Sequence, residues 1–123
     1  MTGIETILIV SADPERRLAW AAWVETRDRR VLRCAGPIAT SCALLQGLPE
    51  CPLHAEVSLA LYDEQSLAPV LRSILRSSHH PPIAIARDRA RPSGGREPEI
   101  IRTIAADARL EGCFGAAGGA HLR

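Results

Sequence analysis

The sequence contains no lysine, so all 15 of its basic residues are arginine. This absence excludes chemistry that needs a lysine amine, such as Schiff-base formation or the phosphate-binding lysine of a P-loop. The arginines are offset by 14 acidic residues, which leaves a formal net charge of +1. A chain with this balance has no general attraction for nucleic acid or for an anionic membrane surface. No helix-turn-helix pair or sustained basic stripe appears either, so we predict no nucleic-acid partner.

Long apolar runs are also missing. No run approaches the roughly 20 residues that a bilayer-spanning helix needs, so we predict no membrane partner. No basic segment followed by a long apolar region opens the sequence, and we therefore expect no signal peptide and a cytoplasmic location. Aromatic residues make up only 3% of the chain. Aliphatic side chains and alanine must therefore fill the core.

The cysteines lack the close spacing that is typical of zinc sites. The four, Cys34, Cys42, Cys51 and Cys113, form no Cys-x-x-Cys pair, so we predict buried, reduced thiols. The adjacent His79 and His80 point in different directions and have no third ligand nearby in sequence. We predict solvated loop histidines there, with no metal and no cofactor.

One stretch organises what is present. Ile7 to Val10 are four consecutive aliphatic residues, which is typical of a strand buried on both faces. The sequence Asp13-Pro14-Glu15 follows and predicts a helix start, because Asp13 can act as N-cap and proline fits the first helical position. The chain therefore turns from a buried strand into a helix, beside the crevice where parallel sheets bind ligands.

Strand and helix patterns alternate along the rest of the chain. We predict further strands at 31–35, 57–62, 83–86 and 112–114, and helices at 14–27, 38–46 and 67–77, with a fourth opened by Pro98 and carrying Ile100, Ile101, Ile104 and Ala108 on its apolar side. Residues 87–96 hold four arginines (87, 89, 91 and 96) and are predicted to form a mobile, solvated loop, with an anion or partner contact as the alternative.

This alternation predicts an α/β fold, a single doubly wound parallel five-stranded sheet. We favour the flavodoxin-like strand order 2-1-3-4-5. Residues 1–114 are expected to form the one domain. Residues 115–123 are rich in glycine and alanine, so they are expected to be a disordered tail and the fifth helix to be missing.

Several stretches resemble the receiver domain of bacterial two-component response regulators. They are Ile7 to Arg17 at the first strand and its turn, Ala43-Leu44-Leu45, Leu59 to Asp63, Pro82 to Ala86, and Gly112-Cys113-Phe114. The resemblance covers nearly the whole chain as a pattern. It implies a phosphoryl group carried on an aspartate and Mg²⁺ held by acidic residues after the first strand. Asp63 lies at or near the acceptor position.

The chain departs from the receiver pattern at the other site positions. Ser11 and Ala12 replace the acidic pair, and Asp13 is one place too far along and has a capping role. Ala86 or Arg87, depending on register, replaces the hydroxyl residue. Receiver domains also carry a lysine after the fifth strand, and the corresponding position falls near Ala116 in this chain. Metal binding, charge neutralisation and readout of a phosphoryl group all lose their usual residues.

These departures predict a pseudo-receiver with a vestigial phosphoacceptor pocket. Its residues are Ser11, Ala12, Asp13, Asp63, Ala86 and Arg87. The first hypothesis is a non-catalytic, phosphorylation-independent signalling or interaction module that binds a protein partner or forms a homodimer. The alternatives are an active receiver that uses Asp63 as phosphoacceptor, and a small-anion sensor in which the turn of Ser11 and Ala12 meets the loop 87–96 over the carboxyl edge of the sheet.

Overall fold

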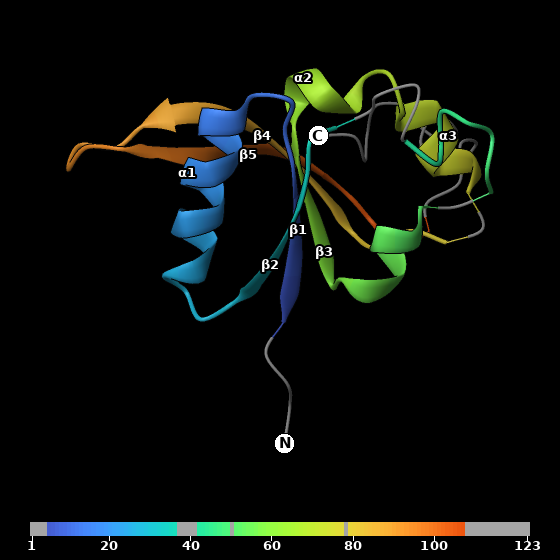
Figure 1. Ribbon diagram of the computed structural model, residues 1–123, viewed down its shortest axis with the longest axis horizontal. Helices are drawn as coiled ribbons and strands as arrows, with labels where there is room; N and C mark the ends of the chain where they lie inside the picture. The colour runs from blue at the N-terminus through green and yellow to red at the C-terminus, as the bar shows by residue number, and fades with distance from the viewer. Residues whose placement is uncertain (1–4, 37–41, 50, 78, 108–123) are drawn as a thin grey trace.

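A single five-stranded sheet forms the centre of the computed structural model, which describes residues 5–36, 42–49, 51–77 and 79–107 (Figure 1). The strands are β1 (Thr6–Val10), β2 (Arg30–Cys34), β3 (Leu59–Asp63), β4 (Ile83–Ala90) and β5 (Arg96–Ile104). Their order is β2-β1-β3-β4-β5. The predicted order is confirmed, but the prediction of a wholly parallel sheet is wrong, because β5 runs antiparallel to β4.

The first strand and helix form as predicted. β1 is the second strand of the sheet and pairs in parallel with both β2 and β3. Residues Ile7 to Val10 are buried, as expected for a strand covered on both faces. Helix α1 (Pro14–Glu25) starts directly after Asp13, whose side chain accepts hydrogen bonds from the backbone N–H groups of Glu15 and Arg16.

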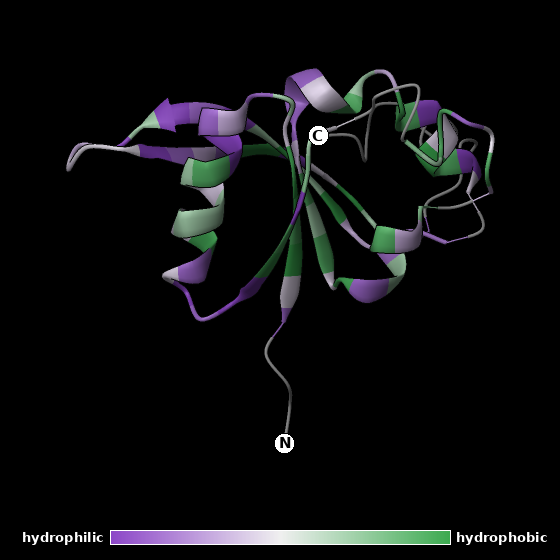
Figure 2. Cartoon of the chain, in the orientation of Figure 1, coloured by the Kyte–Doolittle hydropathy of each residue, from purple (hydrophilic) through white to green (hydrophobic). Residues whose placement is uncertain are grey.

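The two faces of the sheet have separate cores. Helix α1 lies over one face, where Trp20 and Val24 pack against Ile7, Ile9 and Leu61. The other face is covered by the 3₁₀ helix η1 (Pro52–Glu56) and the short helices α2 (Glu64–Leu67) and α3 (Leu71–Arg76). Figure 2 shows hydrophobic residues along the centre of the strands and hydrophilic residues along the far end of the β4–β5 pair.

The largest correction concerns residues 87–104. The predicted mobile loop and fourth helix are instead a hairpin of β4 and β5, in which Arg89 pairs with Glu97 and Arg87 with Glu99. Arg89 forms ion pairs with both Glu97 and Glu99, which stabilise the ladder, whereas Arg87 faces Glu99 without an ion pair in the described residues. The turn is closed by a hydrogen bond from Arg91 N to Gly95 O at 3.0 Å. The predicted strand at 83–86 is therefore longer, and its neighbour in the sheet comes from residues predicted to be helical.

A bulge explains why the strand pattern of β5 was missed. Ile85 pairs with Arg102 but Ala86 pairs with Ile100, so Ile101 is an extra residue on β5. The extra residue breaks the two-residue alternation of a strand. Ile104 consequently packs in the core on the α2 side, a position that two-residue alternation along β5 does not predict. The isoleucine spacing then matches a helix by coincidence.

Other segments differ in smaller ways. The helix predicted at 67–77 is two short helices, because Pro69 lacks the N–H that a continuous helix requires. Asp63 is the N-cap of the first of them, α2. In the segment predicted as a helix at 38–46, the described residues form a turn that ends at Gly47 with a φ of +90°. Residues 112–114 and 115–123 lie outside the described residues. No described helix is long and apolar enough to cross a membrane.

Candidate functional site

The site that the sequence indicated lies where β1 and β3 end side by side. Ser11 follows β1 directly, and Asp63 is the last residue of β3. Both side chains are buried, at 0% and 3% exposure. Ser11 Oγ donates a hydrogen bond to Asp63 Oδ2 at 2.9 Å. The parallel pairing of the two strands therefore brings together residues that are far apart in sequence.

The Asp63 carboxylate is held by three donors. Besides Ser11, the guanidinium of Arg16 binds Oδ2 through Nη1 at 2.8 Å. The other oxygen, Oδ1, accepts from the backbone N–H of Gln65 at 3.2 Å, which makes Asp63 the N-cap of α2. A buried carboxylate needs such partners, since burial without them is strongly unfavourable. Asp63, the residue at the expected phosphoacceptor position, thus forms an ion pair with Arg16.

Arg16 lies between two carboxylates. Its Nη1 binds Asp63, and its Nε lies 3.6 Å from Asp88 Oδ2. Burial acts to lower the pKa of the Arg16 guanidinium, but the hydrogen bond and charge of Asp63, with the charges of Asp88 and Asp13, raise it above its usual value. Arg16 therefore stays cationic and neutralises the Asp63 carboxylate from within the chain.

Asp88 connects the pocket to helix α1 and to the hairpin. Its Oδ1 accepts from Trp20 Nε1 at 2.9 Å, and its Oδ2 accepts from Arg96 Nε at 2.7 Å. Burial acts to raise the pKa of Asp88, but the hydrogen bonds from Arg96 and Trp20 and the charges of Arg96 and Arg16 lower it. Two carboxylates and two guanidinium groups, those of Asp63, Asp88, Arg16 and Arg96, thus form a network with no net charge, here named the carboxyl-edge network.

The remaining predicted residues play other parts. Asp13 is exposed, and its side chain caps α1. The N–H of Ala12 donates to Ser66 Oγ at 3.0 Å. Ala86 is fully buried and pairs with Asp63 across β3 and β4. Arg87 is exposed and lines a separate groove with Glu64. The structure therefore joins Ser11 to Asp63 and leaves Arg87 outside their network.

The histidines and cysteines were predicted to bind no metal. No group of three or more metal-binding side chains occurs in the ranges that the structure describes. Cys34, Cys42 and Cys51 are free and half-buried, and Cys113 lies outside those ranges. His80 is only 1% exposed, so the prediction of two solvated histidines is wrong for that residue. Its ring Nδ1 lies 2.8 Å from the carbonyl oxygen of Pro81.

Sequence reasoning missed Arg16, Asp88 and Arg96 as members of the site. One signal was present for Arg16: a cation in the first turn of a helix is unfavourable beside the positive end of the dipole, which suggests a nearby anion. No comparable signal marked Asp88, because the hairpin that carries it was interpreted as a loop.

No protein-family model, no curated protein and no solved structure matches this chain.

Proposed function

We propose that the chain is a receiver-like interaction module that works without phosphorylation and catalyses no reaction. The observation that supports this most strongly is the contact between Arg16 and Asp63. Oδ2 of Asp63 already binds a guanidinium and a hydroxyl, at 2.8 and 2.9 Å. Oδ2 could attack a phosphoryl donor only after Arg16 and Ser11 left it, and Oδ1 accepts a hydrogen bond from the backbone N–H of Gln65 at 3.2 Å.

Electrostatics support the same proposal. Transfer of a phosphoryl group needs cations that can neutralise its oxygens, and a divalent ion is the usual one. Here Arg16 and Arg96 are already engaged by Asp63 and Asp88. Asp63 and Asp88 are in turn neutralised, which weakens their attraction for Mg²⁺. The carboxyl-edge network therefore stabilises an arrangement in which these charged side chains bind one another.

The alternative of a small-anion sensor finds less support at this edge. The hairpin arginines that were expected to attract an anion are paired with carboxylates of the chain, Arg89 and Arg91 with Glu97 and Arg96 with Asp88. Arg87 differs from these three, because it forms no ion pair within the described residues. It lies outside the turn of Ser11 and Ala12.

Incubation with acetyl phosphate and Mg²⁺, followed by intact-mass measurement, tests the proposal. We expect no phosphate adduct on the wild-type chain. Arg16→Ala serves as a matched comparison, because it frees Asp63 from its cation without altering the carboxylate. A wild-type adduct that disappears in Asp63→Asn would show an active phosphoacceptor and overturn the proposal.

A further inference from the structure

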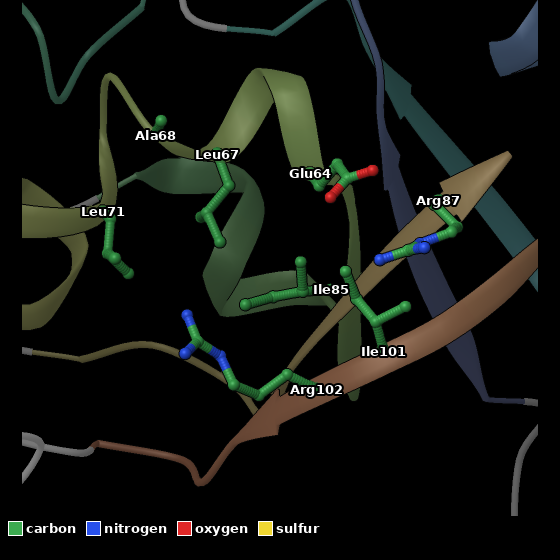
Figure 3. Close-up of a pocket in the computed structure, with 8 residues that line it drawn as sticks. All are labelled: Glu64, Leu67, Ala68, Leu71, Ile85, Arg87, Ile101 and Arg102. Atoms are coloured by element: carbon green, nitrogen blue, oxygen red, sulfur yellow. The ribbon is translucent and has the colours of Figure 1, made fainter. Parts of the chain in front are cut away.

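The groove that Arg87 and Glu64 line lies on the sheet face opposite α1, between the helices α2 and α3 and the hairpin (Figure 3). Its volume is about 440 Å³. Eight residues line it: Glu64, Leu67, Ala68, Leu71, Ile85, Arg87, Ile101 and Arg102. We name it the β5 groove. It shares no residue with the carboxyl-edge network.

The floor of the β5 groove is apolar. Leu67 and Ile85 are almost fully buried beneath it, and Leu71 is half-buried at one side. Ile101, the extra residue of the bulge, is 40% exposed. The bulge therefore presents a large apolar side chain next to the groove. Exposed apolar surface of this kind gains free energy when a ligand covers it.

The rim of the groove is mainly cationic. Arg87 and Arg102 are both exposed and form no ion pair with any residue in the described ranges, whereas Arg89, Arg91 and Arg96 of the same hairpin all do. In Figure 3, Ile85 lies between the two guanidinium groups, with Glu64 beside Arg87. Two separated cations therefore flank an apolar floor.

This arrangement selects the chemistry of an occupant. Its carboxylates must be spaced on either side of apolar side chains, as on a helix with acidic residues bordering a leucine or isoleucine stripe. Guanidinium groups bind carboxylates in a planar, two-pronged geometry. Residues 108–123 of the chain itself match poorly, because they contain Arg109 and Arg123 but a single acidic residue, Glu111.

We propose that the β5 groove binds an acidic amphipathic helix of a partner protein. This inference builds on the proposed function, since it names the partner chemistry of the interaction module. The partner's apolar side chains would cover Ile101 and the exposed part of Leu71. Its carboxylates would bind Arg87 and Arg102. The acidic character gives orientation and a faster association rate, and the apolar contact removes the exposed side chain of Ile101 from water.

The test begins with phage-displayed random peptides selected on the immobilised full chain. We expect the enriched peptides to contain Asp and Glu together with Leu or Ile at helical spacing. An enriched peptide, labelled with fluorescein, is then titrated in an anisotropy assay. The double variant Arg87→Glu/Arg102→Glu should weaken binding by about tenfold or more, because both contacts become repulsive.

A matched control removes the effect of net charge. The double variant Arg30→Glu/Arg33→Glu makes the same change of four charge units on β2, at the opposite edge of the sheet, and should change the affinity by less than about twofold. Thermal unfolding of every variant establishes that the fold is retained. Equal weakening by Arg30→Glu/Arg33→Glu, enrichment of basic peptides, or no enrichment at all would overturn the groove assignment.

Other occupants give distinct results. A second copy in the groove would appear as a dimer in sedimentation velocity that Arg87→Glu/Arg102→Glu dissociates, and that result would contradict a helix of a different protein. Displacement of the peptide by millimolar benzoate or phosphate alone would indicate a small-anion site. A phosphate adduct on Asp63 would overturn the proposed function without altering peptide binding, so the two failures are separable.

Discussion

The carboxyl-edge network and the β5 groove use arginine in opposite ways. Arg16 and Arg96 are bound to carboxylates of their own chain, at 2.8 and 2.7 Å. Arg87 and Arg102 lie exposed along an apolar groove, without an ion pair in the part of the chain that the structure describes. A guanidinium with a buried partner fixes the fold, whereas one beside open apolar surface can select a ligand. The difference identifies where binding is expected and where it is not.

Acid should reveal the largest effect, at a buried group that lacks a counter-charge. His54 is 1% exposed; its Nε2 lies 3.2 Å from Tyr62 Oη, and its Nδ1 has no hydrogen-bond partner among the described residues. Burial, with the nearby His80 and His79, lowers the pKa of His54 from 6.5 to about 4. The buried carboxylate of Asp63, by contrast, has a counter-charge, which is the guanidinium of Arg16.

The pH dependence of stability follows from that pKa. Between about pH 6.5 and pH 4 the unfolded chain takes up a proton at His54 that the folded chain does not, so acid favours unfolding. The free energy of unfolding should decrease by up to about 3 kcal/mol across this window and be constant, for this residue, above it. Urea unfolding of His54→Gln should show a shallower acid loss, and an unchanged slope would contradict this assignment.

Removal of the Arg16 cation should have the next largest effect. Arg16→Met leaves the Asp63 carboxylate buried with only the Ser11 hydroxyl and the Gln65 N–H. We expect a loss of about 2–3 kcal/mol, below the value for a fully buried pair, because the Arg16 side chain is 22% exposed. Urea unfolding measures the loss. Arg33→Met on β2 is the control and should change stability by less than about 0.5 kcal/mol.

The link to the hairpin should matter less. Asp88→Asn can still accept from Trp20 Nε1 but loses the charge that attracts Arg96 and Arg16. We expect a loss of about 1 kcal/mol, because Arg96 is half exposed and solvent takes over part of its charge. Relative to wild type, Asp88→Asn should accelerate the hydrogen exchange of the backbone amides in Arg87 to Ala90 more than in Ile83 to Ala86. Uniform acceleration along β4 would contradict a local role.

The smallest effect on stability is expected at the groove. Arg87→Ser and Arg102→Ser should each change the free energy of unfolding by less than about 0.5 kcal/mol, as is usual for exposed side chains. The same variants should weaken the binding of the selected acidic peptide. A loss of stability comparable with that of Arg16→Met would show that these arginines have structural partners, and would remove the contrast between the two regions.

Local signals in the sequence predicted the first strand and helix, and the alternation of strands and helices predicted the strand order. The aliphatic run Ile7 to Val10 and the cap at Asp13 are short-range features, and both formed as expected. The hairpin was missed because its decisive features are pairings between strands. Arg89 facing Glu97 and the bulge at Ile101 depend on register, which no single segment shows.

The candidate site was predictable to a similar extent. Ser11 and Asp63 follow two apolar runs, and parallel strands bring such ends together. Arg16 was adjacent to a predicted cap, but its partner could be known only from the direction of its side chain. Asp88 and Arg96 lie on a hairpin that was predicted to be a loop. Long-range ionic contacts of this kind follow from the tertiary structure.

A double-mutant cycle between Arg16 and Asp63 tests the central claim most directly. Urea unfolding of wild type, Arg16→Met, Asp63→Asn and the double variant gives the coupling energy of the two side chains. If this ion pair closes the pocket, the coupling should be about 1–2 kcal/mol, and the double variant should be more stable than the two single losses added together predict. A coupling near zero would show that Asp63 does not depend on Arg16, and would contradict the closed pocket.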